Sequence, residues 1–334
     1  MYKSFLKIFI LLQSFVFSFA LCNEQEFSTF NYKYNKNYNL SEYKRRYNIF
    51  CKNNNFINNY NEHSPNLKLE MNKFGDMDSV EFKNYNSFKM NNNNYVKNNY
   101  VKNNYVKNLK LNSVPDSLDW RDIGMVTKVK DQGQCGSCWA FSAIASLESV
   151  NAIHGNHKLY NLSEQELVDC STDYGNLGCG GGLMDNAFEY MMKYGIASDK
   201  VYSYNASDNA CNINKTKPLL NVSRYYDVPK NNEKQLMYAV VGNPVSVAID
   251  ASDPTFQFYK SGIYNISDCG NNLDHGVTVV GYGKDNIYKL DYWIVKNSWN
   301  TDWGYNGYIY MRRNHEDPQG MCGIAMCSSY PAMN

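Results

Sequence analysis

The chain is organised around residues 130–142, which read Lys130-Asp131-Gln132-Gly133-Gln134-Cys135-Gly136-Ser137-Cys138-Trp139-Ala140-Phe141-Ser142. The part before Cys138 is rich in Gly and Gln, which is typical of a turn. After Cys138, apolar residues such as Phe141, Ile144 and Ala145 recur at helical spacing. We therefore expect Cys138 at the N-terminus of a long buried helix.

This position favours chemistry at the Cys138 sulfur. The first N–H groups of a helix and the positive end of its dipole stabilise a thiolate, which is the nucleophilic form of cysteine. The same N–H groups can stabilise an oxyanion that forms on a substrate carbonyl.

Two residues far along the chain complete a pattern with Cys138. His275 lies 137 residues after Cys138, and Asn297 lies 159 residues after it. The Cys-Gly-Ser-Cys-Trp signature of papain-like and cathepsin proteases is followed by a His and an Asn at roughly 130–150 residues. One loop insertion would explain the slightly longer spacing to Asn297. From about residue 42 to its C-terminus, the chain resembles the papain-like cysteine proteases, and within them the cathepsin L group.

The resemblance implies a role for each of these residues. Cys138 would be the nucleophile, and His275 the base that forms an ion pair with it and later protonates the leaving amine. Asn297 would orient the imidazole, as the third member of a triad does. Gln132 would complete the oxyanion hole with the Cys138 N–H. Trp299 would shield the His–Asn pair from water.

Charge divides the chain into unlike parts. The 334 residues carry a net charge of +1, which argues against a nucleic-acid binder. Residues 21–113 hold 14 basic and 8 acidic residues, and residues 114–334 hold 17 and 24. The net charges of +6 and −7 suggest that the first part lies on the second, although two independently soluble domains would also fit.

Residues 1–20 are predicted to be a signal peptide. Lys3 and Lys7 precede an apolar run, and Ser18-Phe19-Ala20 provides a small-residue cleavage site. The run is too short to span a bilayer easily, so no membrane anchor is expected. The chain should enter the secretory pathway, where disulfides form, and reach the lysosome or the exterior.

Residues 21–113 are expected to be an inhibitory propeptide. An interspersed helical signature resembles that of cathepsin L-like propeptides and comprises Glu42, Arg46, Phe50, Asn53, Ile57 and Asn61. The run Asn72-Lys73-Phe74-Gly75-Asp76 matches most of their second motif, with Glu70 where Gly often begins it. Residues 91–108 are low in complexity and predict an accessible linker. The mature enzyme should start near Val114.

Residues 114–334 form the expected peptidase domain. Helices are predicted after Cys138, after a capping box at Ser163-Glu164-Gln165-Glu166, over Leu183–Tyr194 and over Asn232–Val241. Strands are predicted over Val245–Ile249, Val277–Tyr282, Tyr292–Lys296 and Tyr308–Arg312. The resulting fold class is α+β and papain-like, with a helical half, a β-barrel-like half and an active-site cleft between them.

The resemblance also assigns the cysteines and the substrate-binding residues. It pairs Cys135 with Cys179, Cys170 with Cys211 and Cys269 with Cys322, and leaves Cys138 and Cys327 as free thiols. It places Gly181 and Gly182 on the edge that pairs with substrate backbone. Met184, Ala248 and Cys327 would line the pocket for the second substrate residue before the cut. We expect that pocket to prefer Leu, Val or Phe.

Six sequons are candidates for N-glycosylation, at Asn39, Asn161, Asn205, Asn214, Asn221 and Asn265. No metal or cofactor is expected. The expected partners are protein and peptide substrates and the chain's own propeptide, and cystatin-type inhibitors are further candidates. The protein should be a monomer.

We interpret the chain as a cysteine endopeptidase made as a zymogen for protein degradation in an acidic compartment. Nothing resembles the His-rich occluding loop of cathepsin B, which favours cleavage inside chains. One alternative is a thiol–disulfide oxidoreductase that uses Cys135 and Cys138, although no thioredoxin-like pattern surrounds them. Another is an inactive relative that acts as a binding protein or inhibitor.

Overall fold

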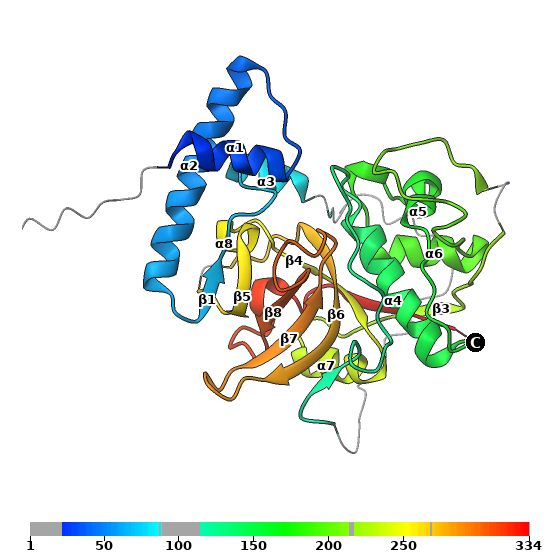
Figure 1. Ribbon diagram of the computed structural model, residues 1–334. Coiled ribbons are helices and arrows are strands. Elements are labelled where there is room, and N and C mark those ends of the chain that lie inside the picture. The colour runs from blue at the N-terminus through cyan, green and yellow to red at the C-terminus, as the bar shows by residue number, and fades with distance from the viewer. Residues whose placement is uncertain (1–21, 87, 89–113, 214–216, 268, 334) are drawn as a thin grey trace, which may run out of the picture.

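The computed structural model describes residues 22–86, 88, 114–213, 217–267 and 269–333. The predicted signal peptide, the linker 91–108 and the sequon at Asn214 lie outside these ranges. Two packed halves and a separate N-terminal segment make up the fold (Figure 1). The structure thus has the expected papain-like architecture of a helical and a sheet half preceded by a helical prosegment.

The helical half is built around α4 (Cys138–His154), the long buried helix that the sequence predicted. Residues 138–152 of α4 are all buried, because other elements pack around the helix. The neighbours α5 (Glu164–Cys170) and α6 (Met184–Tyr194) contribute to the same apolar cluster. At the start of α5, Ser163 caps the N–H of Glu166, but the Glu166 carboxylate accepts from Tyr190 and Ala197 instead of completing a capping box.

The other half is a mostly antiparallel sheet with the strand order β1-β5-β8-β7-β6-β4-β9-β3, and β2 pairs with β6. Its long central strands are β6 (His275–Lys284) and β7 (Asp291–Lys296). The remaining strands are β1 (Leu67–Leu69), β2 (Leu118–Asp119), β3 (Arg224–Asp227), β4 (Val245–Ile249), β5 (Tyr259–Tyr264), β8 (Tyr308–Arg312) and β9 (Ser328–Ala332). The sheet is open, so the half is barrel-like without being a closed barrel. Its core includes two buried tryptophans, Trp293 and Trp303.

Two further helices flank the sheet, α7 (Glu233–Gly242) and α8 (Pro254–Gln257). The predicted helix 232–241 is therefore confirmed with its start shifted by one residue, because Asn232 acts as the N-cap of α7. Leu183 likewise precedes α6 as its N-cap. Gly195 ends α6 with a φ of 72°, a conformation that glycine adopts readily.

The prosegment contains α1 (Glu24–Lys33), α2 (Leu40–His63) and α3 (Ser79–Tyr85). In Figure 1 these blue and cyan helices lie over the yellow strand β5 and helix α8. The prosegment strand β1 pairs antiparallel with β5, so the prosegment extends the sheet of the mature part. Within the described residues two ion pairs join the two parts. In Lys73–Asp131 the prosegment supplies the cation, as its net charge predicts, whereas in Lys260–Glu70 it supplies the anion.

Disulfides join Cys135 to Cys179, Cys170 to Cys211 and Cys269 to Cys322 in the structure, and Cys138 and Cys327 are not in disulfides. A further disulfide links Cys22 to Cys51 in the prosegment. Five of the sequon asparagines, at positions 39, 161, 205, 221 and 265, are exposed. Across the described ranges no helix is long and apolar enough to cross a bilayer.

Candidate active site

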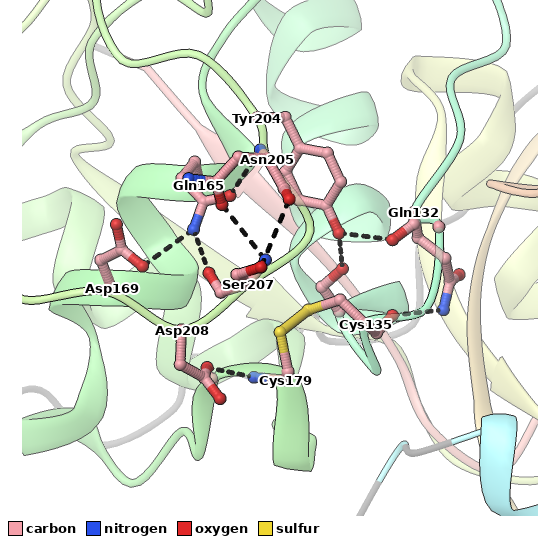
Figure 2. Close-up of a disulfide and its surroundings, with 12 residues drawn as sticks. Gln132, Cys135, Gln165, Asp169, Cys179, Tyr204, Asn205, Ser207 and Asp208 are labelled. Carbon is pink, nitrogen blue, oxygen red and sulfur yellow. Dashed lines mark hydrogen bonds between the residues drawn. A yellow bond between two sulfur atoms is a disulfide. The ribbon is translucent and has the colours of Figure 1, made fainter.

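The candidate nucleophile, Cys138, is the first residue of α4 and is fully buried. The turn before it is held by the disulfide between Cys135 and Cys179 and by the Gly136 N–H, which donates to the Cys179 carbonyl over 3.1 Å. Figure 2 shows this disulfide between the turn and the segment that follows α5. The covalent link fixes the direction from which the chain enters α4.

His275 is the first residue of β6, and this end of the strand lies directly against the start of α4. A Cβ atom built on the adjacent Gly276 would be 3.3 Å from the backbone carbonyl carbon and oxygen of Cys138. A side chain at position 276 would therefore push the strand away from the helix. The close approach brings the residues predicted as base and nucleophile together from two halves of the fold.

The imidazole of His275 is held by a hydrogen bond to Asn297. Its Nε2 lies 2.8 Å from Oδ1 of Asn297, which also accepts the Ser298 N–H over 2.7 Å. Because a carbonyl oxygen only accepts, Nε2 carries the proton and Nδ1 is the basic nitrogen of the neutral ring. In the described part of the chain, Nδ1 is buried without a hydrogen-bond partner. The arrangement can thus accept a proton at Nδ1.

Aromatic rings enclose the His–Asn pair. The indole of Trp299 stacks on His275 with 4.5 Å between ring centroids, and neither side chain is exposed. Burial lowers the pKa of His275 to about 4, against the opposing effect of the Asn297 hydrogen bond. With the prosegment in place, the ring is therefore neutral near pH 7, which disfavours the ion pair that the sequence predicts.

Gln132 lies beside the turn that precedes Cys138. Its Nε2 donates to the Cys135 carbonyl over 3.0 Å, and its Oε1 accepts the Ser298 hydroxyl over 2.7 Å. An amide group has two N–H donors, so one remains for another acceptor. The side chain is fully buried and fixed at both ends, which is the preorganisation that an oxyanion site requires.

The predicted substrate-binding residues come from both halves, since Gly181, Gly182 and Met184 lie at or just before the start of α6, Ala248 lies in β4 and Cys327 directly precedes β9. Gly182 has no room for a side chain, because a Cβ there would approach Trp139 to 2.8 Å and the Asn176 oxygen to 2.4 Å. Met184 and Ala248 are buried in the same apolar cluster as Cys138, and Cys327 packs against it. Burial, helped by Asp185, raises the pKa of the Cys327 thiol to about 12, so the thiol stays neutral. Gly181 has a φ of 114° and precedes this group.

The prosegment covers the site. Phe88 forms a bridge with Gly182 and belongs to the apolar cluster that holds Cys138. Phe74, Phe82 and Tyr85 contact the Trp299 indole edge-on, with centroid distances of 5.0, 5.5 and 6.0 Å. The Tyr85 hydroxyl donates to the Gly133 carbonyl over 2.6 Å.

Several residues around the site were not anticipated from the sequence. Phe88 follows the recognised propeptide motifs, and no pattern distinguishes it from other aromatic residues of the Asn-rich region. Ser298 lies between Asn297 and Trp299, and no motif gives its own side chain a role. Tyr204, whose hydroxyl contacts both Ser137 and the Gln132 backbone, carries no motif at all.

Comparisons with known proteins agree with this geometry. Residues 114–332 match the family described as papain family cysteine protease, and residues 27–82 match the cathepsin propeptide inhibitor domain. The chain belongs to the papain family of cysteine proteases, and it carries its inhibitory propeptide domain in the same polypeptide.

The similar proteins include proteases and their precursors. Vignain of Ricinus communis is 47% identical over 295 residues, which cover 87% of this chain and 81% of vignain. The recombinant stem bromelain precursor superposes with a TM-score of 0.84 at 39% identity, covering 93% of this chain and 98% of that one. Digestive procathepsin L 3 of the Tenebrio molitor larval midgut gives a TM-score of 0.83 at 41% identity, with 92% and 98% covered. The chain is therefore a cysteine protease zymogen.

Proposed function

We propose that this cysteine endopeptidase cleaves peptide bonds through Cys138, His275, Asn297 and Gln132. The observation that carries the proposal is the 2.8 Å contact between His275 Nε2 and Asn297 Oδ1, on a strand that abuts the backbone of Cys138. This contact leaves Nδ1 of His275 as the basic nitrogen of the neutral ring. A base oriented by a third group, beside a cysteine at a helix N-terminus, is the arrangement that activates a thiol.

In the proposed reaction, His275 takes the thiol proton and the Cys138 sulfur attacks the carbonyl carbon of the substrate. The oxyanion that forms accepts hydrogen bonds from the Cys138 N–H and the Gln132 amide. The imidazolium then protonates the leaving amine as the carbon–nitrogen bond breaks, which leaves a thioester. His275 next deprotonates a water molecule that attacks the thioester, and the thiolate departs.

The specificity proposal rests on the apolar cluster beside Gly181 and Gly182. Met184, Ala248 and Cys327 would line a pocket that takes an apolar residue at the second position before the cut. Phe88 of the prosegment is buried in the same cluster, which supports an apolar ligand there.

We infer that the precursor enters the secretory pathway through residues 1–20 and acts in the lysosome or outside the cell. Processing near Val114, at the boundary of residues 21–113 and 114–334, would release the mature enzyme in an acidic compartment. The prosegment would act as an intramolecular inhibitor of the monomeric enzyme, because it covers the residues named above. N-glycans at the exposed sequons and inhibition by cystatin-type proteins are compatible with this assignment.

Labelling with the epoxide inhibitor E-64, followed by peptide mapping, tests the nucleophile. We expect the label on Cys138 alone, and no hydrolysis by Cys138→Ala. His275→Ala should lower kcat at least about 100-fold, since acid–base catalysis contributes that much or more. Robust turnover by purified Cys138→Ala would contradict the mechanism.

The oxidoreductase alternative requires Cys135 and Cys138 to form a redox pair. In the structure Cys135 is bonded to Cys179, which gives Cys135 another partner. A thiol titration that found a reducible Cys135–Cys138 disulfide in the native protein would favour the alternative.

A further inference from the structure

The hydroxyl of Tyr204 bridges two residues that flank the site. It lies 2.7 Å from the backbone carbonyl oxygen of Gln132 and 2.6 Å from the hydroxyl oxygen of Ser137. Figure 2 shows the tyrosine hydroxyl directed toward Gln132, next to the disulfide of Cys135. The segment that carries Tyr204 lies between α6 and β3, far from either partner in the sequence.

The directions of these hydrogen bonds follow from the chemistry of the groups. The Gln132 carbonyl can only accept, so Tyr204 donates its single proton to it. Ser137 must then donate its hydroxyl proton to the Tyr204 oxygen. Burial raises the pKa of Tyr204, against the opposing effect of the Ser137 hydrogen bond. The hydroxyl is therefore a proton donor throughout the working range of pH.

Ser137 occupies an unusual role for a helix N-cap. A serine in this position commonly accepts a hydrogen bond from the first turn, which stabilises the helix. Ser137 makes no side-chain cap hydrogen bond, and its hydroxyl contacts Tyr204 instead. The side chain of the residue before the nucleophile thus contacts Tyr204, while its backbone carbonyl accepts the N–H groups of Ala140 and Phe141 in α4.

Hydrogen bonds to the turn before Cys138 and to Ser298 also hold the side chain of Gln132. The Cys135 carbonyl accepts both the Gln132 amide and the Ser137 N–H, over 3.0 and 2.9 Å. Ser298 holds the opposite end of the amide. Tyr204 supplies one contact to the Gln132 main chain, whose N–H also donates to the Ser298 carbonyl over 2.9 Å. Together these bonds set the distance between the Gln132 amide and the start of α4.

We propose that Tyr204 is a positioning residue for the oxyanion hole, because its hydroxyl fixes Gln132 relative to the Cys138 N–H. This inference rests on the proposed roles of Gln132 and Cys138. Donors in such a site must already be in place when the oxyanion forms, and small displacements reduce the rate of reaction. Tyr204 itself does not contact the substrate in this proposal.

Tyr204→Phe is the variant that tests it. The change removes only the hydroxyl and keeps the ring, which packs edge-on against Phe141 at 4.9 Å. We expect kcat for a peptide amide to fall about tenfold, less than the 100-fold or more lost with an entire oxyanion donor. KM should change less than twofold. Each enzyme is purified as the full chain, matured at acidic pH and quantified by titration with E-64.

Two probes separate positioning from general damage to the site. A peptide aldehyde adds to the Cys138 sulfur and places a negative oxygen in the oxyanion hole, so its affinity should fall about tenfold. Iodoacetamide reacts with the same sulfur without forming an oxyanion, so its rate should change less than twofold. An equal loss with both probes would overturn the proposal, because it would indicate a disturbed nucleophile.

Tyr202→Phe is the matched control. Tyr202 lies in the same segment and donates to Asp169 over 2.8 Å, away from Gln132. Its loss should leave kcat and aldehyde affinity unchanged. Ser137→Ala removes the other partner of Tyr204 and should reproduce part of the Tyr204→Phe effect, which keeps the proposal testable if Tyr204→Phe does not fold.

Gln132→Ala distinguishes this proposal from the proposed function. If Gln132→Ala lowers kcat by 100-fold or more while Tyr204→Phe has no effect, only the role of Tyr204 is wrong. If Gln132→Ala retains full activity, the oxyanion hole itself is assigned wrongly, and the inference fails with it.

Discussion

Phe88 of the prosegment forms a parallel bridge with Gly182, on the edge proposed to pair with substrate backbone. Its N–H also donates to the carbonyl of Asp274, the residue before His275, over 2.8 Å. Because Phe88 is 4% exposed, its ring fills space beside the nucleophile. Phe88 therefore adds a buried aromatic ring and two backbone contacts to the other prosegment residues that cover the site.

Phe88→Ala should weaken this inhibition. Removing a buried phenylalanine ring costs about 3–5 kcal/mol of packing, here lost from the contact between prosegment and peptidase. We expect maturation of the full chain at pH 5 to be at least tenfold faster, measured by gel densitometry. Tyr32→Ala is the control, since Tyr32 of α1 is 91% exposed. Equal maturation rates for Phe88→Ala and wild type would show that Phe88 is not an important inhibitory contact.

The sequence predicted the parts of the fold that are governed by local patterns. Helix α4 and strands β4 and β8 follow from regular apolar spacing. Strands β5 and β9 were missed because Gly262 and Pro331 interrupt them, and their pairing with distant strands determines their conformation.

The residues proposed for the chemistry are those that a sequence motif marks, whereas the residues proposed to position them carry no motif. Tyr204 acts through a hydroxyl that reaches residues about 70 positions earlier, so nothing in its own neighbourhood marks it. Helix α1 and the Cys22–Cys51 disulfide were also missed. They depend on packing of Phe27 and Phe30 against Phe50, which only the folded prosegment brings together.

Acid should destabilise the prosegment through Glu81. Burial favours the neutral acid, but hydrogen bonds from Arg45, the Asp78 N–H and Arg46 outweigh it and hold the pKa of Glu81 below its usual value. A lowered carboxyl pKa stabilises the fold above the unfolded value near 4.5, and this contribution is lost as pH falls through the folded value. Maturation near Val114 should therefore be faster at pH 4–5 than at pH 7, and the rate should rise further as the pH falls toward 4. The opposite net charges of prosegment and peptidase domain predict the same direction.

Glu81→Gln tests this contribution. It should accelerate maturation at pH 6 and reduce the difference between pH 6 and pH 4. Glu62→Gln, at an exposed position near the end of α2, should follow wild type. Maturation of wild type at equal rates across pH 4–7, at fixed ionic strength, would contradict the electrostatic explanation.

The prosegment should also lower the pKa of His275. Burial lowers the pKa of its ring to about 4, so the covered form binds fewer protons than an exposed histidine with the ordinary value of 6.5. As pH falls from about 6.5 toward 4, protonation then favours the uncovered site. In the full-length Cys138→Ala variant, NMR titration should give a midpoint near 4 for His275. Cleavage of the same variant near Val114 by wild-type enzyme should raise that midpoint. An unchanged midpoint would show that protonation of His275 does not contribute to the release of the prosegment in acid.

Substrate selectivity should depend on the charge at position 327. In wild type the Cys327 thiol is neutral and gives no charge to an arginine at the second substrate position, and the nearby Asp185 and Asp227 carboxyls already interact with Lys230. Burying an unpaired charge costs several kcal/mol unless its head reaches water. We expect kcat/KM for peptides with Leu there to exceed that for Arg at least tenfold. Comparable cleavage of both by wild type would show that the pocket is assigned wrongly.

Cys327→Glu should invert part of this preference by supplying a carboxylate for arginine. The new carboxyl would lie near Asp185 and Asp227, whose negative charges should raise its pKa. The gain on Arg peptides should therefore be largest near pH 7 and decline toward pH 4, as the new carboxyl becomes protonated. Cys327→Ser changes the residue without adding charge and should keep the preference for Leu at every pH. If Cys327→Ser and Cys327→Glu gave the same ratio of Arg to Leu cleavage, residue 327 would lie too far from the substrate to select it.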